Sequence, residues 1–218
     1  MTKSEIIGSI VDVGVIPVIR AHSADIAKRA IDAIKKGGLS VLEITMTVPG
    51  AVKLIEEVVR HFGTEAIVGA GTVLDAETAR ACILSGAQFI VSPSLDLETI
   101  SCCRRYSIPV MPGALTPTEV VTAWKAGADL VKVFPANAVG GASYLKSLKA
   151  PLPQVELVPT GGVSLKTAAD FIKAGASALG VGADLVDTKA LAEGQPQIIT
   201  ERTTQFIQIV KEARSERQ

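Results

Sequence analysis

The sequence predicts an α/β protein of the (β/α)8 TIM-barrel class, with a single domain over residues 1–218. Short apolar runs typical of buried strands occur eight times, about every 20 to 27 residues. A segment with helical periodicity follows each run, which is the pattern of repeated βα units. The length of 218 residues suits one such barrel. We expect further helices at the N-terminus and the C-terminus of this domain.

The predicted strands are uniformly apolar. Runs such as VIPVIR, AIVGAG and DLVKVF contain few polar residues, which is typical of strands buried on both faces of a parallel sheet. The strands are predicted to begin near Val15, Leu39, Ala66, Gln88, Ile108, Asp129, Val155 and Ala178. The regular order favours a closed barrel over an open, doubly wound sheet.

The helical segments have recognisable start and stop signals. The segments ADIAKRAIDAIKK and VKLIEEVVRHF show the apolar spacing of a helix face. Predicted N-caps are Ser23, Asp75, Thr116 and Ser164, and predicted stops are Gly37, Gly38, Gly86, Gly127 and Gly175. We expect a loop from Asp187 to Pro196, followed by a last helix from about Ile198 to Arg214.

Composition excludes several classes of protein. Lys plus Arg and Asp plus Glu both number 22, and this balance argues against a broad nucleic-acid-binding surface. The three cysteines do not form a disulfide framework, and no cluster of metal ligands is visible. No signal peptide is evident, and no apolar run reaches the ~20 residues that span a bilayer. We therefore expect a cytoplasmic protein with no membrane partner and no metal.

Strand alternation brings a lysine and a glutamate into the barrel interior. In the second strand, Glu43 shares a face with Val41 and Thr45, while the other face is apolar and suits the helix layer. In the sixth strand, the same reasoning turns Lys132 inward. The active sites of such barrels lie at the C-terminal ends of the strands, where both residues are expected.

This pair has two interpretations. Burial lowers the pKa of an amine, and a neutral Lys132 amine is a nucleophile toward carbonyl groups, with Glu43 as a general acid and base. The alternative is a buried ion pair that only supports the barrel. The chemical interpretation is favoured because groups with perturbed pKa values cluster at functional sites.

Two glycine-containing turns predict an anion site. TGGVS, residues 160–164, follows the seventh strand, and GVGADL, residues 180–185, includes the end of the eighth. In barrels these two loops commonly bind phosphate through backbone N–H groups. Tight turns are the alternative. GAGTVL, residues 69–74, lacks the third glycine of a dinucleotide fingerprint, so we reject a Rossmann site.

Three further residues are open to two interpretations each. Arg20 ends the first strand and suits either a substrate carboxylate or a strand-end salt bridge. Thr72 suits the same carboxylate or the cap of the next helix, and Phe134 suits the core or a substrate-facing wall.

At these residues the sequence resembles the family of 2-keto-3-deoxy-6-phosphogluconate aldolases and 4-hydroxy-2-oxoglutarate aldolases. The matching motifs are VIPVIR, GGLSVLEITMTVPGA, IVGAGTVLD, GAQFIVSPSLD, MPGALTPTE, LVKVFPAN, PTGGVS and GVGADLV. They occur in order from about Val15 to Val186 and cover most of the chain.

The resemblance implies a class I aldolase, a metal-independent aldehyde-lyase that uses no organic cofactor and assembles as a homotrimer. It implies Lys132 as the Schiff-base lysine and Glu43 as the general acid and base. The substrate-binding residues that we predict, pyruvate end first and phosphate end last, are Arg20, Thr72, Pro93, Phe134, Thr160, Gly161, Gly162, Gly182 and Ala183.

Two positions depart from the pattern of some relatives. Thr47 stands where some members have an arginine for the pyruvate carboxylate, so we assign that role to Arg20. Ala183 stands where a serine is common, which removes a hydroxyl contact to phosphate.

The resemblance leaves the substrate open. The expected reaction cleaves 2-keto-3-deoxy-6-phosphogluconate to pyruvate and glyceraldehyde 3-phosphate. The alternatives are cleavage of 4-hydroxy-2-oxoglutarate to pyruvate and glyoxylate, cleavage of the 6-phosphogalactonate epimer, and a phosphate-binding barrel without aldolase activity.

Overall fold

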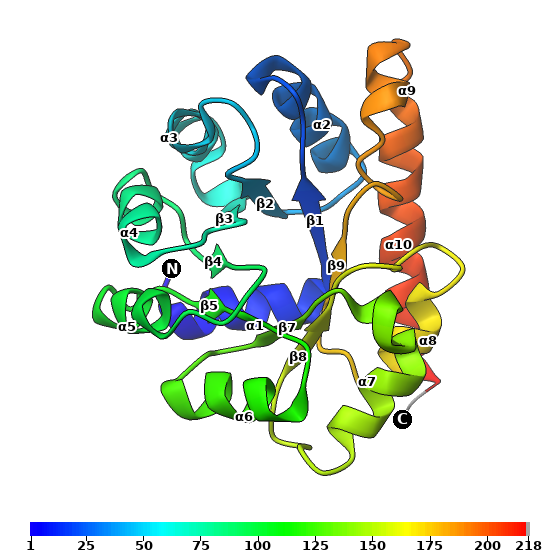
Figure 1. Ribbon diagram of the computed structural model, residues 1–218. Coiled ribbons are helices and arrows are strands. Elements are labelled where there is room, and N and C mark those ends of the chain that lie inside the picture. The colour runs from blue at the N-terminus through cyan, green and yellow to red at the C-terminus, as the bar shows by residue number, and fades with distance from the viewer. Residues whose placement is uncertain (217–218) are drawn as a thin grey trace.

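A computed structural model describes residues 1–216 and shows an α/β fold with a curled parallel sheet surrounded by helices (Figure 1). The strands are β1 Val15–Ile19, β2 Val41–Thr45, β3 Ile67–Gly71, β4 Ile90–Val91, β5 Val110–Met111, β6 Gly113–Ala114, β7 Val131–Val133, β8 Leu157–Pro159 and β9 Leu179–Val181. The α-helices are α1 Lys3–Val13, α2 Ala24–Lys36, α3 Ala51–Phe62, α4 Ala76–Leu84, α5 Leu97–Arg105, α6 Pro117–Ala126, α7 Gly141–Lys149, α8 Ala168–Lys173, α9 Thr188–Ala192 and α10 Gln197–Ser215. Two 3-10 turns, η1 Gly63–Glu65 and η2 Ala136–Val139, complete the elements.

Within residues 1–216 the strands form two hydrogen-bonded sheets, in the orders β5-β4-β3-β2-β1-β9 and β6-β7-β8, and every pairing is parallel. Pro112 separates β5 from β6 in what the sequence predicts as one strand, because proline has no backbone N–H to donate. A bridge between Thr160 and Gly180 links the end of β8 to β9. The predicted strand positions are thus confirmed to within a few residues.

The helix starts agree with the sequence at three of four predicted caps. The side chains of Ser23, Asp75 and Thr116 each accept a backbone N–H in the first turn of α2, α4 and α6. Ser164 is not a cap: α8 begins at Ala168, because Ser164 and Thr167 instead form a hydrogen-bonded turn.

The predicted loop from Asp187 to Pro196 was wrong in part, because it contains the short helix α9. Asp187 caps α9 through a hydrogen bond from the Ala190 N–H, and Leu191 is buried on its inner side. Five helical residues are too few for a periodic apolar pattern to be visible in the sequence.

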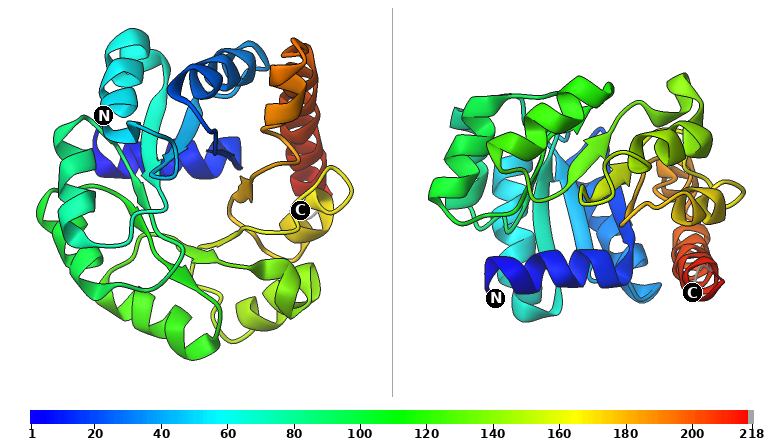
Figure 2. Two further views of the ribbon diagram at one scale, coloured as in Figure 1. Left: turned by 45° about the horizontal axis from the view of Figure 1, so that its top comes forward. Right: turned by 90° about the horizontal axis from the view of Figure 1, so that it is seen from below.

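Two apolar clusters lie on the two faces of the sheet. The outer cluster fills the space between strands and helices, and the inner cluster contains one or two residues from most strands together with two from α1. Its buried members are Ile6, Ile10, Ile16, Val41, Ile67, Phe89, Val91, Met111, Leu130, Val158 and Ala178. Helix α1 lies across one end of the strands, as Figure 2 shows.

None of the helices within residues 1–216 is both long and apolar enough to cross a lipid bilayer.

Candidate active site

Glu43 and Lys132 both lie on the inward face of the sheet, as the strand alternation predicts. Glu43 continues the row that starts at Val41, and Lys132 continues the row that starts at Leu130. Each is only 2% exposed. Lys132 is held between Gly113 of β6 and Val158 of β8 by the strand register. Buried ionisable groups are rare unless they pair with each other or perform chemistry.

Burial shifts both groups toward their neutral forms. Desolvation lowers the pKa of Lys132, and the Arg20 cation lowers it further, while the charge of Glu43 acts in the opposite direction. Desolvation raises the pKa of Glu43, although the charges of Lys132 and Arg20 oppose this shift. Burial therefore favours the neutral amine of Lys132 and the protonated carboxyl of Glu43.

Glu43 and Lys132 do not form a direct ion pair. Among residues 1–216, Lys132 makes no contact within 4.0 Å of a carboxylate, and the buried Oε1 of Glu43 has no hydrogen-bond partner. A Cβ atom at Gly71, at the end of β3, would overlap this carboxylate oxygen. An unpartnered carboxylate oxygen is costly in a core, and it is available to a substrate hydroxyl or to water. The interpretation of Glu43 and Lys132 as an ion pair that only supports the barrel is therefore not favoured.

Arg20 and Phe134 lie beside the pair. Arg20 follows β1 directly, is exposed, and forms no ion pair with any residue that the structure describes, so the strand-end salt bridge is not present. Its positive charge lowers the pKa of both Glu43 and Lys132. The half-buried ring of Phe134 lies 5.1 Å from Lys132 Nζ and forms a wall next to the amine.

Thr72 and Pro93 lie at the ends of the neighbouring strands β3 and β4. Thr72 has φ +56°, which is unusual for a β-branched residue, and the cap of α4 is Asp75, so Thr72 does not cap that helix. Pro93 is half-buried, and its carbonyl lies so close to Gly113 that a Cβ there would overlap it. Both residues lie at the end of the sheet toward which Glu43 and Lys132 extend their rows.

The turn after β8 contains two glycines and a free backbone donor. Gly161 and Gly162 have φ +94° and +73°, and Thr160 before them is buried. The amide of Gly161 belongs to the bridge between Thr160 and Gly180, whereas the amide of Gly162 donates no hydrogen bond to any residue between 1 and 216. Asn137 of η2, which the sequence analysis did not single out, lies against both glycines, so that a Cβ on Gly162 would be 2.5 Å from Asn137 Cβ. Its approach depends on the turn after β7, which the sequence marked only through the motif LVKVFPAN that ends at Asn137.

The turn after β9 adds two further donors. The amides of Gly182 and Ala183 also make no hydrogen bond within the described part of the chain, and Ala183 is exposed. The bridge between Thr160 and Gly180 brings this turn next to the first one. Convergent backbone N–H groups on neighbouring turns suit an anion such as a phosphate.

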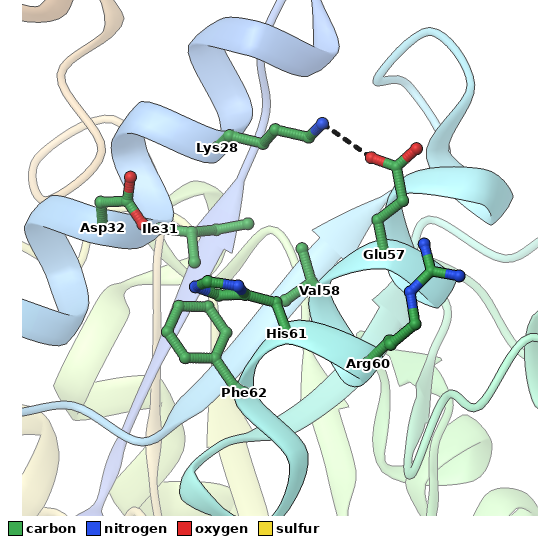
Figure 3. Close-up of a pocket in the computed structure, with 8 residues that line it drawn as sticks. All are labelled: Lys28, Ile31, Asp32, Glu57, Val58, Arg60, His61 and Phe62. Atoms are coloured by element: carbon green, nitrogen blue, oxygen red, sulfur yellow. Dashed lines mark ion pairs between the residues drawn. The ribbon is translucent and has the colours of Figure 1, made fainter.

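A separate cavity of about 550 Å³ lies between α2 and α3, outside the sheet (Figure 3). Lys28 of α2 and Glu57 of α3 form an ion pair of 2.7 Å across it, and Phe62 contributes to its apolar lining. No predicted site residue lines this cavity, so it belongs to the helix layer. Across residues 1–216, no group of three or more His, Cys, Asp or Glu side chains is arranged to hold a metal ion.

Comparison with known proteins identifies the family of the chain. A family model described as KDPG and KHG aldolase matches residues 6–202. The 2-dehydro-3-deoxy-6-phosphogalactonate aldolase of Escherichia coli K12 is 37% identical over 171 residues, which cover 78% of this chain and 83% of the relative.

Two solved structures share the fold. The KDPG aldolase of Legionella pneumophila, with pyruvate captured at low pH as a covalent carbinolamine intermediate, has a TM-score of 0.84 and 29% identity over 94% of this chain and 97% of the other. A designed porous protein cage, made by fusing symmetric oligomeric domains, has a TM-score of 0.83 and 31% identity over 93% of this chain and 74% of the other. The matching family model and the identities confirm the resemblance of the motifs, and the chain belongs to the KDPG and KHG aldolase family.

Proposed function

We propose that this chain is a class I aldolase, an aldehyde-lyase that holds pyruvate as a Schiff base on Lys132. One observation carries the proposal: a buried lysine with a lowered pKa faces the same interior as a buried carboxylate that has no partner. A neutral amine attacks a ketone, and a nearby carboxyl group can transfer each proton that the reaction moves. The carbinolamine in the Legionella relative supports the same chemistry here.

The cleavage follows from these two groups. The amine of Lys132 adds to the C2 carbonyl, and loss of water from the carbinolamine gives a cationic iminium. Glu43 then accepts the proton of the C4 hydroxyl, the C3–C4 bond breaks, and its electron pair moves into the iminium to form an enamine. An aldehyde leaves, and protonation at C3 gives the pyruvate iminium, which water hydrolyses. The iminium holds the electron pair that C–C cleavage releases, which is the role of a covalent intermediate.

The remaining predicted residues bind the two ends of the substrate in this proposal. Arg20 and Thr72 bind the carboxylate, while Pro93 and Phe134 enclose the pyruvate portion. The free amides of the two turns bind a phosphate, which their lack of protein partners supports; this end of the site comprises Thr160, Gly161, Gly162, Gly182 and Ala183.

We assign 2-keto-3-deoxy-6-phosphogluconate as the substrate, with pyruvate and glyceraldehyde 3-phosphate as products. The galactonate epimer is an alternative because the E. coli relative is named for it. Ala183, which offers no hydroxyl to a phosphate, favours 4-hydroxy-2-oxoglutarate as a third candidate. The ratio of kcat/KM values for the three acids identifies the substrate.

At the level of the whole molecule we propose a single domain over residues 1–218, a complete (β/α)8 barrel and a homotrimer in the cytoplasm. The Thr160–Gly180 bridge supports closure between β8 and β9. The oligomeric domains of the designed cage support self-association, and the free thiols of Cys82, Cys102 and Cys103 suit a reducing compartment. The site residues carry out the proposed steps with no metal or organic cofactor.

Trapping with borohydride tests the covalent step. Pyruvate with sodium borohydride is expected to add a reduced pyruvyl group to Lys132, detected by peptide mass spectrometry. Lys132→Ala is expected to abolish both the adduct and hydrogen–deuterium exchange at the pyruvate methyl, whereas Lys125→Ala, a change to an exposed lysine of α6, leaves both intact. A wild-type protein that binds phosphorylated acids without methyl exchange would be a non-catalytic barrel and would refute the proposal.

A further inference from the structure

Thr45 connects the end of β2 to the end of β1. Its side chain is fully buried on the face that carries Glu43, and its hydroxyl donates a hydrogen bond of 3.0 Å to the carbonyl oxygen of Ile19. Ile19 is the last residue of β1, and the same carbonyl carbon is bonded to the nitrogen of Arg20. The hydrogen bond therefore fixes the peptide unit from which Arg20 starts.

The direction of the bonds at Thr45 is determined by its partners. A backbone carbonyl can only accept, so the single hydroxyl proton of Thr45 is committed to Ile19. Thr47 Oγ1 lies 2.7 Å from Thr45 Oγ1 and must therefore donate to it. The exposed Thr47 hydroxyl thus holds the side chain of Thr45 in the rotamer that reaches β1. The two hydroxyls form a chain from the loop after β2 to the backbone before Arg20.

Arg20 needs such support because no residue between 1 and 216 holds its side chain by a hydrogen bond or an ion pair. It is exposed and makes no ion pair with residues 1–216, although its charge acts on both Glu43 and Lys132. A guanidinium forms two parallel hydrogen bonds to a carboxylate only from a narrow range of positions. The long side chain of an arginine reaches these positions reliably only when the backbone to which it is attached is fixed.

We propose that Thr45 is a positioning residue for Arg20, and that its hydrogen bond to Ile19 aims the guanidinium at the carboxylate of the bound 2-oxo acid. This inference rests on the proposed function. Because the carboxylate keeps its charge throughout the reaction, Arg20 is expected to hold substrate and transition state alike. Loss of Thr45 should then raise KM and leave kcat nearly unchanged.

A double-mutant cycle on pyruvate methyl exchange tests the inference. Thr45→Val is expected to raise the KM for pyruvate about tenfold, the effect of one lost hydrogen bond with its carbonyl left unpaired. In an Arg20→Gln background the same change is expected to alter KM less than about twofold, because no guanidinium remains to be aimed. Thr45→Ser keeps the hydroxyl and is expected to restore the wild-type KM.

Thr203→Val provides the matched control. Thr203 is also fully buried and donates to the Ile199 carbonyl, but it lies in α10, so its loss should change stability without changing KM. If Thr45→Val does not fold, Thr47→Val, which changes an exposed side chain, replaces it in the cycle. Thr47→Val is expected to raise KM about threefold when Arg20 is present, and to leave KM unchanged in Arg20→Gln.

An unchanged KM, or equal increases with and without Arg20, would overturn the positioning role. A wild-type protein without methyl exchange would instead refute the proposed function, so the two failures are distinguishable.

Discussion

Lys132 owes its lowered pKa first to burial and not to a neighbouring charge. The distinction matters because the Glu43 carboxylate favours the charged amine and opposes the shift. The missing ion pair between the two weakens that opposition. Arg20 acts in the same direction as burial on the amine, so the cation proposed for the substrate carboxylate also helps to keep the nucleophile neutral.

This arrangement gives a pH prediction. Exchange of the pyruvate methyl should increase as pH rises through the pKa of Lys132, which lies below the ordinary lysine value of about 10.4. Arg20→Gln removes a cation that lowers the pKa of both Lys132 and Glu43, so both pKa values should rise. The kcat/KM profile should then move to higher pH, as measured by deuterium exchange from about pH 5 to 10.

Arg105→Gln is the control for this shift, because Arg105 is an exposed arginine at the end of α5 and influences neither group. A profile that stays in place in Arg20→Gln would contradict the electrostatic role of Arg20.

At the scale of elements, the proposed site uses different parts of the sheet for the two ends of the substrate. The proposed pyruvate end depends on side chains in or shortly after β1, β2, β3, β4 and β7, whereas the proposed phosphate end depends on backbone amides after β8 and β9. Backbone donors require a particular main-chain conformation and not a particular side chain. Gly162 meets this need with φ +73° and with room for Asn137 beside it.

Gly162→Ala should therefore impair one end of the site alone. The added Cβ meets Asn137 and favours a negative φ, which costs about 1–2 kcal/mol and displaces the donors. We expect KM for the phosphorylated substrate to rise about tenfold, the effect of about 1.4 kcal/mol. The rate of pyruvate methyl exchange should remain near that of the wild type.

Gly194→Ala is the matched control, because Gly194 has φ +75° after α9 and no atom within 4 Å of an added Cβ. It should lose similar stability without any change in KM. An equal loss of pyruvate exchange in Gly162→Ala would show that the two ends are not independent.

At the scale of the whole molecule, α1 closes the end of the sheet opposite the candidate site. Ile6 and Ile10 pack on inward residues of the strands, and Lys3 forms an ion pair of 2.9 Å with Asp129, just before β7. At the same end, Arg214 of α10 donates to the carbonyls of Asp12 and Val11. These contacts cover the apolar inward cluster to which Leu130 belongs, next to Lys132 on the same face of β7, and burial is the main cause of the lowered pKa of Lys132.

Ile10→Ala should separate stability from chemistry. Removing this fully buried side chain should lower the free energy of unfolding by about 2–5 kcal/mol, as measured by urea denaturation. The kcat for aldol cleavage at low temperature should stay within about twofold of wild type, since no proposed site residue is changed. Ile7→Ala, at a half-buried position on the same helix, should cost less stability. A large fall in kcat without loss of stability would place α1 in the catalytic machinery instead.

Local periodicity was sufficient to predict much of this molecule. The period of 2 residues in strands and 3.6 in helices reports burial directly, and it located the strands and the inward faces of Glu43 and Lys132. Three helix caps followed from the residue types at the helix starts. The pair Gly161 and Gly162 marked the turn after β8 for the same local reason, because only glycine readily adopts a positive φ.

Contacts between residues distant in sequence were decided only by the tertiary structure. The bond from Thr45 to Ile19, the approach of Asn137 to Gly162, the space that Gly71 leaves for Glu43 and the absence of a Glu43–Lys132 ion pair are examples. Each contact depends on the positions of neighbouring strands and turns to within about an ångström. The sequence pattern of one strand does not predict its distance from another. The sequence by itself determined which side chains face the interior, and the fold decided which of them meet, because facing follows from a local period and meeting follows from the packing of the whole sheet.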